Sequence, residues 1–379
     1  MLHIFSTPAQ SSNIQTTLTK SPKPKIPKEK LTFGTTFTDH IMEVNWTAGG
    51  GWEAPKIAPY APFQIDPAAS VLHYALECFE GMKAYRDAEG NVRMFRPMKN
   101  MNRFHDSCAR LQFPSFDKEE FLRCIEELVR VDSDWIPEGD GYSLYLRPTA
   151  ISTHPFLGVG PSGSVKLYCM LAPVGPYYPE GFKPTTLLAE RRYVRAWPGG
   201  TGASKLGANY GPTIQPQVQA AAGGFSQVLW IFGNEDGGEV TEAGTMNFMA
   251  FLEKEDGSGR ELVTPALDGT ILPGVTRDSV LTLAKEWGEF EVSERKITMG
   301  EVTRAAEAGR LLECFGCGTA AVVSPIKSIS SEGNVVKPLH PSGDEGAGPL
   351  TQRVWESITG IQYGKVGRPE WSPVISKPE

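Results

Sequence analysis

The sequence predicts a mixed α/β protein built from two domains, and three observations lead to this prediction. The chain has 379 residues, which is longer than the size at which a single hydrophobic core usually stops growing. Apolar runs typical of strands alternate with amphipathic helical patterns in both halves of the chain. The segment PVGPYYPEGFKP, residues 173–184, holds four prolines and two glycines and therefore favours a loop that connects the halves.

We expect four segments along the chain. The prolines in KSPKPKIPKEK, residues 20–30, favour an extended path at the N-terminus. The expected segments are an extended or disordered arm at 1–30, a smaller α/β domain at 31–176, an interdomain loop at 177–186 and a larger mixed α/β domain at 187–379.

Two helices are expected in the smaller domain. The first follows Pro97, and its apolar side chains recur at steps of three and four residues: Met98, Met101, Phe104, Cys108 and Leu111. These side chains should face the core, with Arg103 and Arg110 off this stripe. The second helix should begin at Asp117, where Glu120 completes an acidic version of the capping box.

The larger domain combines strands with helices. VLWIF, MNFMAFL and AAVV are typical of strands, and helices are expected near 275–287 and 299–309. Gly274, Val275 and Thr276 would form the first turn of one helix, whose backbone N–H groups suit an anion. The turn GCGTA, residues 316–320, offers further exposed amides. Together with a suitable lysine, these turns predict a site for one phosphate.

The composition excludes several partners. A net charge of −7 lacks the basic excess that nucleic-acid binding requires. No apolar run approaches the roughly 20 residues that span a bilayer, and the N-terminus lacks the apolar core of a signal peptide. We therefore expect an intracellular, cytoplasmic protein. The first 28 residues hold four lysines but no Asp or Glu, which keeps mitochondrial import as an alternative.

Cys314 and Cys317 form a C-x-x-C pair, whereas the cysteines at positions 78, 108, 124 and 169 are isolated. Such a pair suits a redox or metal site. However, LLECFGCGTAAVV is typical of a buried strand that runs into a glycine turn, in which free cysteines behave as small apolar side chains. No second Cys or His pair has zinc-like spacing, so we expect no metal site.

The stretch GGTGASKLGANYGPT, residues 199–213, surrounds Lys205 with five glycines. A glycine-rich loop with a lysine can hold nucleotide phosphates, or a lysine on a tight turn can form a Schiff base with a carbonyl cofactor. A Walker loop needs Gly before the lysine and Ser or Thr after it, but here Ser204 precedes and Leu206 follows. The pattern therefore disfavours a nucleotide.

Schiff-base chemistry with pyridoxal phosphate needs two further groups, which are an anion site for the phosphate and a carboxylate facing the ring nitrogen. The carboxylate keeps the ring protonated, so that the ring draws electrons from the substrate Cα. Glu242, in EVTEAGTMNF, lies at a strand entrance where a turn can direct it inward. On its own, however, a lone glutamate is more often a solvated loop residue.

Eight stretches support the second possibility, and they occur in this order from about residue 31 onward: FGTTFTDH, LHYALECFEGMKAYR, NMNRF, YLRP, GGTGASKLGANYGPT, TEAGTMNF, LPGVTR and GCGTA. In order and approximate spacing they resemble the branched-chain amino acid aminotransferases, which are pyridoxal phosphate enzymes of fold type IV. The resemblance implies a smaller N-terminal α/β domain, a larger C-terminal pseudo-barrel domain and an active site at the domain interface. It also implies ping-pong transamination of L-leucine, L-isoleucine and L-valine with 2-oxoglutarate, in biosynthesis or catabolism.

The resemblance assigns the catalytic and cofactor-binding residues. Lys205 would hold pyridoxal 5'-phosphate as a Schiff base and then move the proton that leaves the substrate Cα. Glu242 would pair with the pyridine nitrogen, and Tyr210 would hydrogen-bond to the 3-oxygen of the ring. The phosphate would contact the amides of Val275 and Thr276, the side chain and amide of Thr319, and the guanidinium of Arg103.

The resemblance also assigns a substrate pocket that accepts aliphatic and acidic side chains. Its wall would consist of Phe33, Phe79, Tyr145, Tyr177 and Thr245. Arg147 would serve the γ-carboxylate of glutamate, and the amides of Thr319 and Ala320 would serve the α-carboxylate. The site would be completed by a partner subunit, so a homodimer is implied, through the residues Tyr74, Leu157 and Val159.

One position departs from the family. Some members carry a redox-sensitive C-x-x-C just after the G-T-A turn, where this chain has the residues 321–324, AVVS. Cys314 and Cys317 precede the turn, so no thiol regulation is implied. D-amino acid aminotransferases and aminodeoxychorismate lyases share the lysine and glutamate chemistry and are the alternative enzymes. A colourless, non-catalytic protein that keeps only the glycine loop for a nucleotide is the alternative from another class.

Overall fold

The computed structural model describes residues 10–176, 184–340 and 346–376. Contacts divide these residues into two compact units. The first unit holds residues 10–176, 204–208 and 361–376, and the second holds residues 184–203, 209–340 and 346–360. The short segment that carries Lys205 thus packs with the first unit. Most of the loop predicted at 177–186 lies outside the described residues, and the predicted domain boundaries stay predictions.

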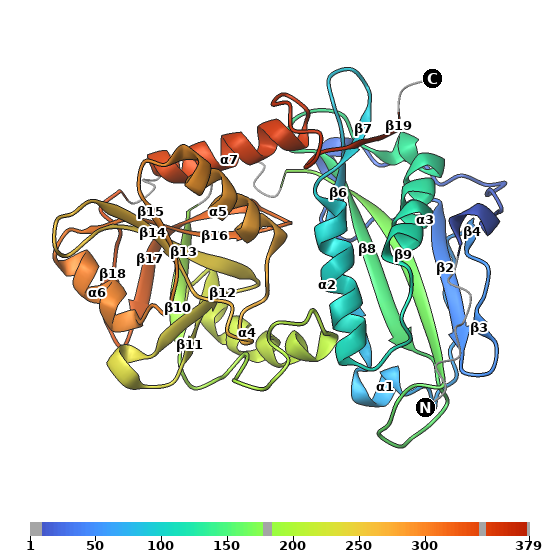
Figure 1. Ribbon diagram of the computed structural model, residues 1–379, viewed down its shortest axis with the longest axis horizontal. Helices are drawn as coiled ribbons and strands as arrows, with labels where there is room; N and C mark the ends of the chain where they lie inside the picture. Colours follow the sequence, from blue (N-terminus) through green and yellow to red (C-terminus); the bar gives the residue numbers. More distant parts are fainter. Residues whose placement is uncertain (1–9, 177–183, 341–345, 377–379) are drawn as a thin grey trace. The chain divides into compact units, whose positions relative to one another are not determined.

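Within the described residues, the first unit is built on a ten-stranded sheet with the order β1-β4-β2-β9-β8-β6-β7-β19, in which β3 also pairs with β2 and β5 with β8 (Figure 1). The antiparallel pair β8 and β9 supplies its longest ladder. The strands are β1 Gln15–Thr16, β2 His40–Thr47, β3 Gly51–Trp52, β4 Lys56–Pro59, β5 Glu77–Phe79, β6 Met82–Arg86, β7 Val92–Met94, β8 Ser143–Ser152, β9 Ser164–Val174 and β19 Val374–Ser376.

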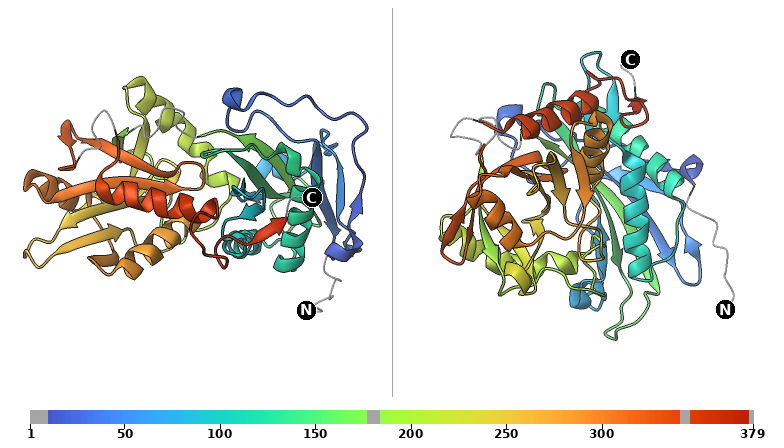
Figure 2. Two further views of the ribbon diagram at one scale, coloured as in Figure 1. Left: turned by 90° about the horizontal axis from the view of Figure 1, so that it is seen from above. Right: turned by 60° about the vertical axis from the view of Figure 1, so that its left-hand side comes forward.

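Helices α2 and α3 pack side by side against this sheet (Figures 1 and 2). The helix predicted after Pro97 is confirmed, and Met101, Phe104 and Cys108 are buried in the core. The helices of this part are α1 Val71–Tyr74, α2 Pro97–Arg110, α3 Lys118–Val131 and the 3₁₀ turns η1 Ser11–Asn13, η2 Lys28–Lys30 and η3 Ser133–Trp135.

The start of α3 is partly as predicted. Asp117 is confirmed as the N-cap, because its side chain accepts hydrogen bonds from the N–H groups of Glu119 and Glu120. The reciprocal half of the capping box is wrong. The Glu120 carboxylate instead accepts from the N–H and hydroxyl of Ser11, both at 2.7 Å, and so binds the N-terminal segment to the helix.

The second unit is built on a nine-stranded sheet in the described chain, with the order β12-β11-β10-β17-β16-β13-β14-β15. An additional pairing of β12 with β13 closes part of this sheet into a ring, which is the pseudo-barrel, and β18 extends it beside β17. The strands are β10 Thr185–Glu190, β11 Gln227–Phe232, β12 Glu239–Ala243, β13 Met246–Glu253, β14 Arg260–Thr264, β15 Glu291–Glu294, β16 Leu311–Gly318, β17 Val322–Ser331 and β18 Asn334–Val336.

Apolar side chains from the strands of the ring form one buried cluster, which includes Leu187, Leu229, Phe248, Cys314 and Ile326. The helices predicted near 275–287 and 299–309 are confirmed as α5 and α6. The helices of this part are α4 Ile214–Ala222, α5 Val275–Trp287, α6 Met299–Glu307, α7 Pro349–Gln362 and the 3₁₀ turns η4 Gly207–Asn209, η5 Gly211–Thr213 and η6 Glu235–Gly237.

Cys314 and Cys317 lie in β16 as free, buried thiols, which confirms the strand predicted from their surroundings. Burial raises the pKa of both thiols, that of Cys317 to about 12, so neither is a ready thiolate at neutral pH. In the part of the chain that the structure describes, no helix is long and apolar enough to cross a membrane.

Candidate active site

The backbone of Lys205 is fixed against β5 and α2 of the first unit. Its N–H donates to Ser107 Oγ at 2.9 Å, and its carbonyl oxygen accepts from the Phe79 N–H at 3.0 Å. The next residue, Leu206, forms a β-bridge with Cys78. The Lys205 Nζ lies 4.8 Å from the centre of the Phe79 ring. Main-chain hydrogen bonds to two neighbouring elements therefore set the position of Lys205.

Arg103 lies off the apolar stripe of α2 and is nevertheless buried, because it pairs with Glu80. Its Nε and Nη2 donate to the two Glu80 oxygens at 2.7 and 2.8 Å. Glu80 also accepts from Asn100 Nδ2 at 2.8 Å and from the Gly81 N–H at 3.1 Å. Burial raises the pKa of Glu80, but the charges and hydrogen bonds of Arg103, and then the charge of Lys205, bring it below its usual value. Glu80 therefore stays ionised beside Arg103.

Aromatic rings and a second guanidinium form a cluster in the same unit. The rings of Phe33 and Tyr145 meet edge to face with centres 4.9 Å apart. Arg147 donates from Nη2 to the Tyr145 hydroxyl at 3.1 Å, and its guanidinium carbon lies 4.7 Å from the centre of the Phe79 ring. A Cβ at Gly81 would lie 2.1 Å from the Tyr145 hydroxyl, so glycine leaves the room that this tyrosine occupies. The structure thus brings together four residues predicted for the substrate pocket.

Tyr74, Leu157 and Val159 form a separate group. The Tyr74 hydroxyl donates to the carbonyl oxygen of Leu157. The three residues are 38%, 63% and 82% exposed in that order. Clustered apolar side chains at such exposure suit contact with another surface. Tyr177, which was predicted for the pocket wall, lies outside the described residues.

Glu242 lies in β12 of the second unit and is 2% exposed. Its Oε2 is 3.0 Å from Nη2 of Arg195, and its Oε1 accepts from the Leu272 N–H at 2.8 Å. Arg195 is also buried, and its Nη1 donates to the Thr270 carbonyl oxygen at 3.3 Å. Glu242 is therefore no solvated loop residue. It is an interior acid held by a cation and by a main-chain donor, which directs its carboxylate.

The loop before α5 connects Glu242 with the start of that helix. Glu242 pairs with Asn247 across β12 and β13, and Asn247 Nδ2 donates to the Leu272 carbonyl oxygen at 2.9 Å. A Cβ at Gly274 would lie 2.0 Å from Asn247 Oδ1, so glycine permits this close approach. Gly274 is the N-cap of α5, and no side chain caps it, which suits an anion at the helix start. The first turn holds the two amides predicted to bind phosphate, those of Val275 and Thr276.

The other predicted residues of the second unit occupy turns. Thr319 and Ala320 are half-buried in the turn between β16 and β17. Tyr210 precedes η5, and its carbonyl oxygen accepts from Thr213 Oγ1 at 2.6 Å. Thr245 is exposed in the turn between β12 and β13.

The sequence prediction missed three residues that hold predicted ones in place: Glu80, which holds Arg103, Ser107, which holds Lys205, and Arg195, which holds Glu242. Glu80 had a signal, because a carboxylate within the apolar stretch CFEGM must find a cationic partner if it is buried. Ser107 and Arg195 had none. A serine on a helix and an arginine in the run RRYVRAW are ordinary surface residues in most sequences.

These groups fit pyridoxal phosphate. The cofactor requires an amine on a fixed backbone, a carboxylate for the ring nitrogen and donors for a phosphate. Lys205 offers the first and the buried Glu242 the second. The uncapped start of α5 offers phosphate donors, and so does Arg103, whose guanidinium Glu80 holds in place.

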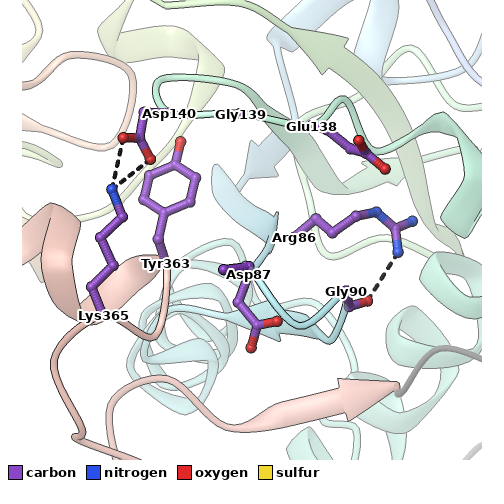
Figure 3. Close-up of a pocket in the computed structure, with 9 residues that line it drawn as sticks. Arg86, Asp87, Gly90, Glu138, Gly139, Asp140, Tyr363 and Lys365 are labelled. Atoms are coloured by element: carbon purple, nitrogen blue, oxygen red, sulfur yellow. Dashed lines mark hydrogen bonds and ion pairs between the residues drawn. The ribbon is translucent and has the colours of Figure 1, made fainter.

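A different cavity, of about 340 Å³, opens on the first unit (Figure 3). Its cations are bound within the protein, since Lys365 Nζ contacts both Asp140 oxygens at 2.7 Å and Arg86 Nη1 donates to the Gly90 carbonyl oxygen at 3.0 Å. The residues that line it include none of those predicted for the active site. We therefore assign it no part in the candidate site.

The chain is similar to known proteins over almost its whole length. The family model described as amino-transferase class IV matches residues 77–329. The branched-chain-amino-acid aminotransferase of Dictyostelium discoideum is 54% identical over 360 residues, which cover 94% of this chain and 93% of that protein. The cytosolic and mitochondrial branched-chain-amino-acid aminotransferases of Saccharomyces cerevisiae are both 49% identical, over 97% of this chain and over 98% and 94% of those proteins.

A solved structure supports the same assignment. A branched-chain amino acid aminotransferase solved in complex with N-(5'-phosphopyridoxyl)-L-glutamate is 27% identical and superposes with a TM-score of 0.66. The match covers 88% of this chain and 98% of that one. The fold is thus fold type IV, with the ring of β10 to β13, β16 and β17 as its pseudo-barrel. The chain belongs to the class IV aminotransferase family and, within it, to the branched-chain-amino-acid aminotransferases.

Proposed function

We propose that this enzyme exchanges amino groups between L-leucine, L-isoleucine or L-valine and 2-oxoglutarate, in a ping-pong reaction that depends on pyridoxal 5'-phosphate. The observation that carries the proposal is the placement of Lys205, which two main-chain hydrogen bonds fix against β5 and α2. The names of its relatives supply the class of amino acid. The phosphopyridoxyl-glutamate bound in the related solved structure supports the cofactor and glutamate as the second amino acid.

In this proposal three side chains act on the cofactor ring. Lys205 Nζ would bond to its aldehyde carbon with loss of water, the Glu242 carboxylate would pair with its ring nitrogen, and the Tyr210 hydroxyl would hydrogen-bond to its 3-oxygen. When bound, pyridoxal phosphate supplies a ring that withdraws electrons from the substrate Cα. The burial of Glu242 should strengthen the electrostatic interaction of its carboxylate with the ring nitrogen, because a charge acts more strongly on a neighbour when water is excluded. The donors to the phosphate are the amides of Val275 and Thr276, Thr319 and Arg103.

Lys205 also moves the proton. Once the amine of the substrate has displaced it from the cofactor, its Nζ would remove the proton from the substrate Cα as a base and then, as an ammonium, donate it as an acid. A single amine can perform both steps if it stays on one face of the substrate. The hydrogen bonds from Lys205 N–H to Ser107 and from Phe79 N–H to the Lys205 carbonyl oxygen keep the residue in place while its side chain moves.

The substrate pocket combines apolar surface with a cation. Phe33, Phe79, Tyr145, Tyr177 and Thr245 would contact an aliphatic side chain, and Arg147 would bind the γ-carboxylate of glutamate. Arg147 suits this function because the Tyr145 hydroxyl and the Phe79 ring orient its guanidinium. The amides of Thr319 and Ala320 would hold the α-carboxylate of every substrate.

We further propose a homodimer in which Tyr74, Leu157 and Val159 complete the site of the partner subunit. The exposure of these apolar side chains supports this, since water is a poor environment for them. Sedimentation analysis with Val159→Asp would test it. The charged variant should shift the protein toward the monomer, with loss of turnover, whereas an unchanged dimer would contradict the assignment of this surface.

For the compartment we propose the cytoplasm, with mitochondria as the alternative. Relatives in one yeast carry both names, so similarity does not decide between them. A tagged full-length chain compared with a chain that starts at Lys30 would separate the two. Mitochondrial staining that disappears with the first residues would contradict the cytoplasmic proposal.

Borohydride reduction followed by peptide mapping tests the chemistry. The treatment should leave a phosphopyridoxyl group on Lys205, and a group on any other lysine would contradict the proposal. Activity should then be measured with L-leucine and D-leucine plus 2-oxoglutarate, and with aminodeoxychorismate for pyruvate release. Turnover of D-leucine alone, or release of pyruvate, would identify one of the alternative enzymes.

A further inference from the structure

Three consecutive residues, Phe79, Glu80 and Gly81, each place one residue of the candidate site. Phe79 donates its N–H to the Lys205 carbonyl oxygen and lies beneath the lysine amine. Glu80 binds Arg103 through both carboxylate oxygens. Gly81 leaves the space for the Tyr145 hydroxyl. This short turn between β5 and β6 thus organises three side chains that are distant from one another in sequence.

Glu80 is the ionisable residue of this turn, and the proposed reaction gives it no function. It has no exposed surface and accepts hydrogen bonds from Arg103, Asn100 and Gly81. A buried carboxylate is costly unless a cation and several donors satisfy it, and Glu80 has both. The pair with Arg103 is bidentate along the Nε and Nη2 side of the guanidinium. Such a pair fixes both the plane and the rotation of the guanidinium.

We propose that Glu80 is a positioning residue that sets the Arg103 guanidinium for the phosphate of the cofactor. The inference rests on the proposed function, in which Arg103 binds that phosphate. A free arginine side chain loses rotamer entropy when it is immobilised. Glu80 imposes this order before the cofactor arrives, so binding of the phosphate is stronger than a mobile arginine would allow. Glu80 itself contacts Arg103 and not the cofactor.

A purely structural function would predict a different behaviour. If Glu80 only balances the buried charge of Arg103, its removal should weaken the fold and the binding of every ligand equally. If Glu80 positions Arg103, its removal should selectively weaken ligands that carry a phosphate. Pyridoxal 5'-phosphate and pyridoxal differ only in that group, so the ratio of their dissociation constants isolates the effect.

The experiment measures the dissociation constants of both ligands for the apoprotein, by absorbance titration, in four proteins. These are the wild type, Glu80→Gln, Arg103→Ala and the double variant. Glu80→Gln should weaken the binding of pyridoxal 5'-phosphate by at least about tenfold, as expected for the loss of an ordered charged hydrogen bond. It should change the binding of pyridoxal little. In the Arg103→Ala background the same substitution should have no selective effect, because its target is gone. Glu119→Gln, which removes an exposed carboxylate of the same unit, should leave both constants unchanged.

Equal weakening of both ligands by Glu80→Gln, or a selective loss that persists without Arg103, would overturn the inference. If Glu80→Gln does not fold, Asn100→Ala serves instead, because it keeps every charge and removes the 2.8 Å hydrogen bond that steadies Glu80, together with a 3.2 Å hydrogen bond to the Gly81 carbonyl oxygen. It should show the same selectivity with a smaller loss, and an unchanged ratio would then overturn the inference. A wild type that binds both ligands equally would refute the proposed function itself, which distinguishes the two failures.

Discussion

Among the described residues, each unit buries a pair of a carboxylate and an arginine near the candidate site residues, and these two pairs have opposite arrangements. In the first unit Glu80 holds Arg103, and the arginine is the residue that we propose to contact the cofactor. In the second unit Arg195 holds Glu242, and the glutamate is the residue with that function. In both pairs the partners come from different elements of the fold.

The pairs also differ in how the partner holds the functional group. Glu80 binds two nitrogens of Arg103 and fixes the plane of the guanidinium, which planar recognition of a phosphate requires. Arg195 reaches one oxygen of Glu242, and the other oxygen accepts from the Leu272 main chain. Two donors from different directions orient a carboxylate toward a third group. Glu80 therefore suits the positioning of a planar guanidinium, and Arg195 together with the Leu272 amide suits the positioning of a carboxylate.

The largest loss of activity is expected for Lys205, because neither ion pair can replace its amine. Lys205→Ala should lower transamination by at least about a hundredfold, the usual contribution of a proton-transfer group. The protein should stay folded, because the contacts with Ser107 and Phe79 use the main chain, which alanine retains. Thermal unfolding and single-turnover kinetics would measure both effects. Lys365→Ala, a surface variant of the same unit, is the control, and residual activity of Lys205→Ala near its level would contradict the assignment.

Glu242→Gln should affect stability as well as turnover. The variant leaves Arg195 buried opposite a neutral amide, and breaking a buried ion pair typically costs 3 kcal/mol or more, so we expect a loss of about 3 kcal/mol in the free energy of unfolding. Cofactor should still bind, but turnover should be slow because the ring nitrogen lacks its anion. Urea unfolding and steady-state kinetics would measure the two effects.

A second substitution separates these effects. Arg195→Met in the Glu242→Gln background removes the unpaired cation and should recover part of the lost stability. It should not restore turnover, because Glu242 is the member of this pair that we propose to contact the cofactor. Recovery of turnover in the double variant would show that the charge balance, and not the Glu242 carboxylate, supports the reaction.

The sequence predicted regular elements better than contacts between distant residues. Helix α2 followed from the spacing of its apolar residues. The glycine-rich stretch singled out Lys205, whose function stays a prediction. The hydrogen bond of Glu120 was predicted within its own helix but goes to Ser11, which lies 109 residues away. Local patterns carry no information about such a competitor.

The lack of long-range information in local patterns also explains why the packing of the Lys205 segment was not predicted. Its position in the sequence suggested the larger domain, yet its segment packs with the first unit through Leu206 and the β-bridge to Cys78. The pairing of Arg195 with Glu242 could likewise not be predicted, since Glu242 lies 47 positions after Arg195 and no motif links them. Only the fold brings such partners to hydrogen-bonding distance.

The pH dependence of stability sharpens the comparison for the first pair. The pKa of Glu80 is below its usual value of 4.5 in the folded protein, so between these two values the unfolded chain binds more protons than the folded one. The stabilisation by Glu80 is thus present above about pH 4.5 and is lost as the pH falls through the folded pKa. Each pH unit in this range should remove up to about 1.4 kcal/mol.

Urea unfolding of the wild type and Glu80→Gln, from about pH 6 to about pH 3, measures this contribution as a difference. The stability difference between the two proteins should shrink as the pH falls, because the glutamine side chain of the variant does not titrate. Glu119→Gln is the control for an exposed carboxylate. A difference that stays constant down to the lowest pH would contradict an ionised Glu80 in the folded state.

The smallest effect is expected for an exposed pair with equally good geometry. Arg304 donates from Nη1 and Nη2 to the two Asp236 oxygens at 2.6 and 2.9 Å, and hydrogen bonds from Arg304 and Thr298 lower the pKa of Asp236 to about 2. Both side chains are more than a third exposed, so water replaces the lost contacts. Asp236→Asn should therefore change the melting temperature far less than Glu242→Gln, and asparagine also tolerates the positive φ of 48° at this position. If the two variants were equally destabilising, pairing geometry rather than burial would determine how much these ion pairs contribute to stability. The distinction between the two buried pairs and the exposed pair would then fail.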